Sequence, residues 1–113
     1  MDGELHLLSP WQHPYSPEGL VRELRREVLG RDHPLFSKSA KALAVAKDRD
    51  DVLFEIDDGS SRIYAVVHLG WTGPFEPSSW LPRTKVFDSL EHWLEFMKAD
   101  HEDYTYREST TGQ

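Results

Sequence analysis

The sequence of 113 residues contains no cysteine, which excludes disulfide bonds and thiol chemistry. No apolar run approaches the roughly 18 residues that a membrane-spanning helix needs, so we expect no membrane segment. The first residues have neither a basic stretch nor a long apolar stretch and therefore predict no signal peptide. Together these absences predict a cytoplasmic protein in a reducing compartment.

Basic residues are scarce relative to acidic ones. The chain has 13 Lys and Arg residues against 20 Asp and Glu residues, which gives a formal net charge of −7. This balance disfavours binding to nucleic acid and to anionic membranes, because both attract a basic surface. It suits docking to a basic partner, and it also keeps a protein soluble. We therefore expect neither nucleic acid nor a membrane as a partner.

Signature motifs of common enzyme and metal-binding classes are also absent. The chain has no P-loop, no G-x-G-x-x-G nucleotide fingerprint, no G-x-S-x-G elbow, no H-E-x-x-H motif and no EF-hand loop. We assign no catalytic residue, no metal ligand and no cofactor from the sequence. A protein without enzymatic activity is favoured over an enzyme.

Two helices are predicted, one near each end of the chain. Pro17 and the apolar periodicity that follows predict a helix over 17–29, ended by Gly30. Its polar face is expected to present Arg22, Glu23, Arg25 and Arg26. A second helix is predicted from Asp88 to about 100–103. Its apolar stripe consists of Leu90, Trp93, Leu94 and Met97.

Between these helices, alternating apolar residues predict antiparallel strands. Residues 52–56 and 63–69 alternate on either side of an Asp-Gly turn at Asp58. Shorter strands are expected at 42–47 and 84–87. We predict an α+β fold in which a helix, a three- to four-stranded antiparallel meander and a second helix follow one another, with the two helices packed on one sheet face.

We expect this fold to form one domain over residues 1–113, with its core at about 16–104 and a polar tail over 105–113. The second sheet face is half apolar, because Tyr64 and Val66 share it with His68. An uncovered face of that kind would allow a homodimer.

His68 ends the strand at 63–69 and is the first candidate for chemistry. As a base or metal ligand it needs a partner brought near by folding, such as Glu55, Asp100 or His101. A histidine on a half-buried strand is more commonly structural. The cluster at 100–103 is either a cation site or a solvated helix end.

Other acidic residues fall in the predicted turns. Those at 48–51 and at 57–58 are expected to stabilise the turns by side-chain hydrogen bonds, or else to form an acidic recognition edge.

The stretch 70–83 is rich in Gly, Pro and Ser yet contains Trp71, Phe75 and Trp80. Aromatic residues in such a loop either fold back as a lid or form a contact surface. Together with Trp11 and the half-apolar sheet face, they define one candidate binding surface. The candidate binding residues are Tyr64, His68, Trp71, Trp80, Asp100 and His101.

Four segments taken in order carry a family resemblance: DDVLFEI, AVVHLGW, P-R-T-x-x-F-x-S-L-x-x-W and M-K-x-D-H-E-D-Y. They resemble a family of small uncharacterised bacterial proteins with a VVHLTW-like strand end, a Pro-rich aromatic loop and a tryptophan-containing last helix. The resemblance covers residues 41–104, and Gly70 stands where the family has threonine. It implies a bacterial, cytoplasmic, single-domain protein, without an established activity.

Two functions follow from these observations. The first is a protein-interaction module, immunity-like or regulatory, that uses the aromatic loop and an acidic edge against a protein partner. The alternative is a small hydrolase or metal-dependent enzyme centred on His68. The first requires exposed loop tryptophans, and the second requires a carboxylate within reach of His68 in a cleft.

Overall fold

The computed structural model describes the backbone of residues 5–111 and the side chains of residues 5–108. It confirms the α+β class with an antiparallel sheet, which has five strands rather than three to four. The elements in chain order are β1 (Trp11–Gln12), α1 (Pro17–Glu27), β2 (Ser39–Ala46), β3 (Asp51–Asp57), β4 (Arg62–His68), β5 (Thr84–Phe87) and α2 (Leu90–Thr111). The additional strand is β1, which pairs two residues with the end of β2.

The sheet is a meander in which neighbours in sequence are neighbours in space, in the order β1-β2-β3-β4-β5. The hairpin of β3 and β4 has the predicted turn. One carboxylate oxygen of Asp58 accepts the backbone N–H groups of Ser60 and Ser61, at 3.0 and 2.9 Å. These hydrogen bonds lower the pKa of Asp58 to about 2, and Gly59 supplies the left-handed backbone with a φ of 97°.

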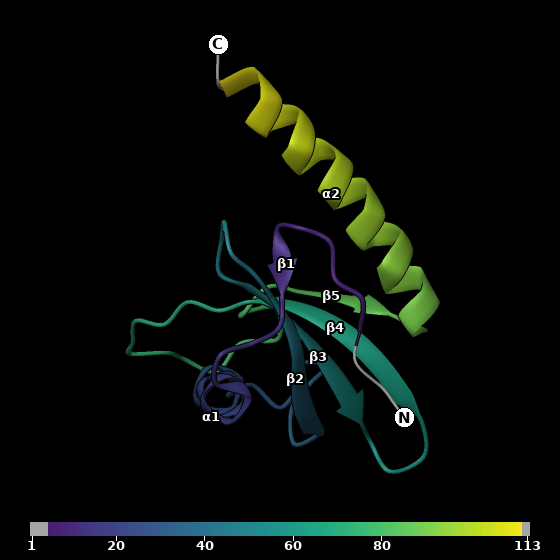
Figure 1. The fold of residues 1–113 in the computed structure, drawn as a ribbon. Helices are drawn as coiled ribbons and strands as arrows, with labels where there is room; N and C mark the ends of the chain where they lie inside the picture. The colour runs from purple at the N-terminus through teal and green to yellow at the C-terminus, as the bar shows by residue number, and fades with distance from the viewer. Residues whose placement is uncertain (1–4, 112–113) are drawn as a thin grey trace.

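The two helices cover opposite faces of the sheet, as Figure 1 shows. Alternation along β3 places Phe54 in the core cluster of α1 and Leu53 in the core cluster of α2. The prediction that both helices share one face is therefore wrong. The physical reason is the half-apolar second face, which α2 covers with Trp93 and Met97.

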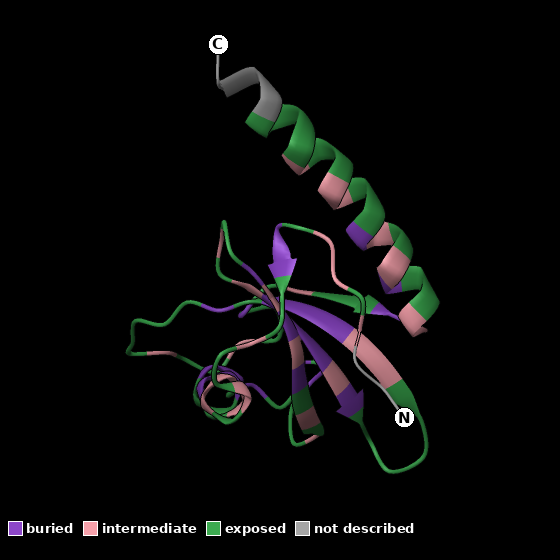
Figure 2. Ribbon diagram, in the orientation of Figure 1, coloured by how far each residue is buried: buried purple, intermediate pink, exposed green. Residues whose placement is uncertain are grey.

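Helix α1 has nearly its predicted bounds, whereas α2 extends well past its predicted end at 100–103 and includes most of the predicted tail. Ion pairs explain the extension. Arg107 pairs with Asp103 one turn earlier at 3.1 Å and with Asp48 beside the sheet at 3.6 Å. Figure 2 shows that residues 102–108 of α2 project from the body and are largely exposed. No helix in the described part of the chain is long and apolar enough to cross a membrane.

Trp93 provides a test of how α2 is attached. Its side chain is fully buried, and its Nε1 has no hydrogen-bond partner among the described residues. We expect Trp93→Ala to lower the free energy of unfolding by about 3–5 kcal/mol because it opens a cavity in the α2 core. Trp93→Phe should cost much less, since no hydrogen bond is lost. Chemical denaturation measures both changes.

His92→Ala is the matched control, because that side chain is exposed on the same helix. It should change the free energy of unfolding by less than about 0.5 kcal/mol. An equal loss in the His92 and Trp93 variants would contradict the packing described here.

Candidate functional site

The loop 70–83 connects β4 to β5 and extends beside α1 (Figure 1). Its first residues are held by Glu27, a buried side chain at the end of α1. One carboxylate oxygen of Glu27 accepts the backbone N–H of Gly70 at 2.7 Å, and the other accepts that of Trp71 at 2.8 Å. The start of the loop is thus fixed by hydrogen bonds to a buried carboxyl group, which are stronger than those between neutral groups.

Arg26, which precedes Glu27 in α1, binds the same part of the loop. It forms a two-pronged ion pair with Glu23 at 3.0 and 3.1 Å. It also donates a hydrogen bond of 2.6 Å to the backbone oxygen of Trp71, and its guanidinium lies 4.9 Å from the centroid of the Phe75 ring. Because Glu27 and Arg26 bind both backbone groups of Trp71, this residue holds an unusual left-handed φ of 67°.

Glu23 and Glu27 lie one helical turn apart, and their carboxyl groups interact. Burial raises the pKa of Glu27, and the hydrogen bond with Glu23 raises it further. Burial alone would raise the pKa of Glu23 too, but hydrogen bonds to Glu27 and Arg26 outweigh this effect and lower it. The two neighbouring carboxyl groups are therefore shifted in opposite directions, with the higher pKa at Glu27. The prediction that Glu23 belongs to the solvent-facing side of the helix is wrong, because Glu23 is buried.

The far end of the loop is held by the segment after α1. Buried His33 accepts the backbone N–H of Leu35 at Nδ1, so its Nε2–H donates to the backbone oxygen of Pro82 at 3.0 Å. Gly30 lets the middle of the loop approach, since a Cβ atom there would overlap the backbone of Ser78. The loop is therefore fixed to the body at its start, middle and end.

Two tryptophans of this fixed loop face solvent. Trp71 is 44% exposed and Trp80 is 66% exposed. Phe75 instead lines a cleft of about 540 Å³ between the loop and the body, together with Leu81, His68 and Arg83. Trp11 is 2% exposed and belongs to the core, where its ring lies edge-on to Trp93 at 5.3 Å. The loop thus combines an inward aromatic ring with two outward ones.

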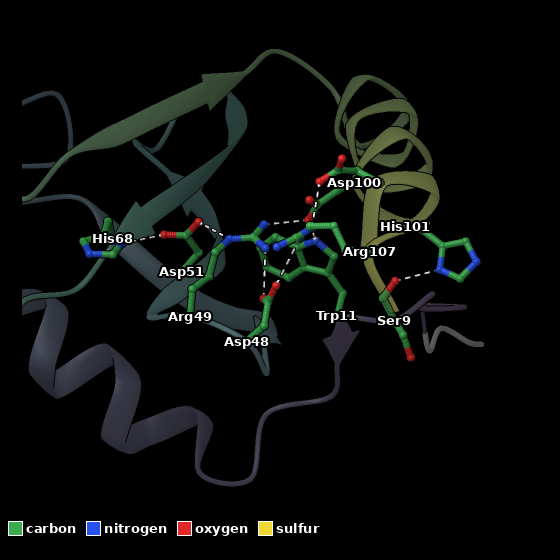
Figure 3. Close-up of polar contacts among 10 residues, drawn as sticks. Ser9, Trp11, Asp48, Arg49, Asp51, His68, Asp100, His101 and Arg107 are labelled. Carbon is green, nitrogen blue, oxygen red and sulfur yellow. Dashed lines mark hydrogen bonds and ion pairs between the residues drawn. The ribbon is translucent and has the colours of Figure 1, made fainter. Parts of the chain in front are cut away.

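His68 pairs with Asp51, its neighbour across β3 and β4. Its Nδ1–H donates to one carboxylate oxygen of Asp51 at 2.9 Å, and the other oxygen accepts from Arg49 at 2.7 Å. Figure 3 shows that Arg49 also joins Asp48 at 2.9 Å and Asp100 at 2.6 Å. Burial alone would lower the pKa of Arg49, but the carboxylates of Asp100 and Asp51 outweigh it and raise the pKa above its usual value.

This network accounts for three residues of the acidic clusters at 48–51 and 100–103, namely Asp48, Asp51 and Asp100. Asp100 also accepts the indole N–H of Trp11 at 2.8 Å, and so it attaches α2 to β1 and to the β2–β3 turn. His101 instead donates from Nδ1 to the backbone oxygen of Ser9 at 2.6 Å (Figure 3). Within the described residues, no group of three or more His, Cys, Asp or Glu side chains could hold a metal ion.

The structure divides the six candidate binding residues among separate places. Tyr64 faces the α2 core and lies opposite Glu55, four positions along β4 from His68. The clefts of about 540 and 360 Å³ that are lined by His68 contain neither Trp71 nor Trp80.

The residues that organise the loop were not identified from sequence. These are Glu23, Glu27, Arg26 and His33. The only signal in the sequence was the spacing of Glu23, Arg26 and Glu27, which puts three charged groups on one stripe of a helix.

Comparison with protein-family models, with curated proteins and with solved structures finds no match to this chain. The resemblance of residues 41–104 to a small bacterial family therefore stays a prediction.

Glu27→Gln tests the attachment of the loop. The amide has only one acceptor oxygen, so one of the two N–H groups at Gly70 and Trp71 loses its partner. We expect a loss of about 1–3 kcal/mol in the free energy of unfolding. Amide hydrogen exchange at these two positions should become faster.

The matched control is Glu76→Gln, an exposed carboxylate on the same loop. It should leave both measurements nearly unchanged. Unaltered exchange at Gly70 and Trp71 in the Glu27 variant would show that this carboxyl group does not hold the loop.

Proposed function

We propose that this protein is a protein-interaction module whose docking surface is the loop 70–83. The observation that supports this function is the exposure of Trp71 and Trp80 on a loop whose backbone is fixed by Glu27, Arg26 and His33. Tryptophan is among the residues that contribute most to binding energy at protein interfaces. A backbone fixed in advance reduces the ordering cost of association.

A lid is the less favoured interpretation of this loop. A lid buries its aromatic rings against its own domain, and only Phe75 does so here. Tyr15 is also fully exposed and lines a shallow depression together with Trp71, which extends the aromatic surface beyond the loop. Two exposed aromatic side chains around one depression, as Tyr15 and Trp71 are, are typical of a contact surface.

The proposed partner is a protein with a basic surface. The net charge of −7 favours encounter with a basic surface. The acidic edge contributes less than the sequence suggested, because Asp48, Asp51 and Asp100 are bound to Arg49. We place this module in the bacterial cytoplasm, in an immunity-like or regulatory role. A homodimer through the second sheet face is not proposed, since α2 covers that face.

A second candidate is a small hydrolase centred on His68. The observation that favours it is the hydrogen bond of 2.9 Å between His68 and Asp51 at the border of two clefts. Asp51 is not one of the partners expected from sequence. Glu55 lies farther along the sheet, Asp100 connects only through Arg49, and His101 bonds to Ser9.

The docking proposal is tested by Trp71→Ala combined with Trp80→Ala. Both substitutions remove side chains only and retain the backbone bonds of the loop. We expect the wild type, used as bait in lysate of the source organism, to retain a specific protein that the double variant loses. With that protein purified, calorimetry should show a loss of affinity of about 2 kcal/mol or more per tryptophan.

Phe36→Ala is the control, because Phe36 is an exposed aromatic residue outside the loop. It should retain the partner. A partner held equally by the wild type and the folded double variant would contradict the docking proposal. If His68→Gln abolishes hydrolysis of an ester or phosphoester substrate that the double variant still cleaves, the second candidate is supported instead.

A further inference from the structure

Cationic side chains gather where β4 and β5 meet, beside His68. The backbone N–H of His68 donates to the backbone oxygen of Arg83 at 2.9 Å, which continues the register that pairs Val66 with Lys85. Residues directly opposite each other on antiparallel strands present their side chains on the same face. His68, Arg83 and Lys85 therefore share the sheet face on which α2 packs.

These three residues line one groove of about 360 Å³ between the sheet edge and α2. Val66 and Phe96 provide its apolar wall. The ammonium group of Lys85 lies 5.6 Å from the centroid of the Phe96 ring, so its charge is at this wall rather than extended into solvent.

The groove has an excess of positive charge. Its one acidic residue, Asp51, already uses one carboxylate oxygen for His68 and the other for Arg49. Among the side chains that the structure describes, no carboxylate forms an ion pair with Arg83 or Lys85. Cations placed side by side repel one another unless an anion lies between them, and the chain as a whole has a net charge of −7. This concentration of unpaired cations points to an anionic ligand.

We propose that this groove binds the phosphate group of a small molecule. The guanidinium of Arg83 can bind two phosphate oxygens at once, and the ammonium of Lys85 adds a point charge for the third. Nδ1 of His68 is bound to Asp51, so Nε2 is the nitrogen that faces the ligand, to which it donates a hydrogen bond in the imidazolium form. Val66 and Phe96 would contact an apolar part of the same molecule. The two exposed tryptophans of the docking loop do not line this groove, and Arg83, the last residue of that loop, is the one residue of the loop that does.

The test is an NMR titration of the ¹⁵N-labelled protein with phenyl phosphate, inorganic phosphate and benzoate at constant ionic strength. We expect saturable shifts of the amides at 66–68 and 83–85 with both phosphates. Arg83→Gln combined with Lys85→Gln should weaken phenyl phosphate binding roughly tenfold or more, since each substitution removes a hydrogen bond to a charged group. Tighter binding of phenyl phosphate than of phosphate would support a role for the apolar wall, and equal binding would support recognition of phosphate alone.

Lys41→Gln combined with Lys98→Gln is the control for charge, since it removes the same two charges from exposed positions that do not line the groove. It should leave the affinity unchanged. The amide spectrum of each variant shows that it is folded. The proposal is overturned if the wild type shows no saturable shift with either phosphate, if benzoate binds as tightly, or if both double variants weaken binding equally.

Discussion

Both faces of the central hairpin are apolar, and the rest of the structure depends on covering both. Phe54 and Val67 lie on one face of the sheet, and Leu53 and Val66 lie on the other, because alternate residues of a strand point to opposite faces. Each face must be buried by a separate element. Helix α1 covers the first pair and α2 the second. Each helix then brings a charged group to the sheet edge: Glu27 on one side of the molecule and Asp100 on the other.

These two carboxyl groups stabilise different parts of the molecule. Asp100 binds Arg49 and Trp11, so it joins α2, β1 and the β2–β3 turn into one unit. Glu27 satisfies the backbone at the start of the loop 70–83 from within the body. Because buried Glu27 and His33 bind backbone groups at both ends of the loop, its large side chains do not have to supply its stability and can face solvent. A loop anchored in this way is suited to recognition.

Local sequence patterns predicted the hairpin and its turn. The alternation of apolar residues and the hydrogen bonds of Asp58 both involve residues that are close together in the sequence. The same logic failed where distant contacts decide the outcome. The strand at Trp11 and the end of α2 depend on Asp100 and Arg107, whose partners are far away in sequence. Composition pointed to the exposed tryptophans of the loop. It could not identify Glu27 or His33, because a charged residue on a helix and a histidine in a connector are ordinarily solvent-exposed.

The chemical environment of His68 is determined by its two cross-strand neighbours in the sheet. Asp51 on one side and Arg83 on the other place it between a satisfied carboxylate and an unpaired cation. The backbone hydrogen bond from His68 to Arg83 also closes the loop 70–83 at its base, because Arg83 is the last residue of the loop and His68 lies just before its start. The proposed phosphate groove therefore includes the last residue of the loop that carries the proposed docking surface.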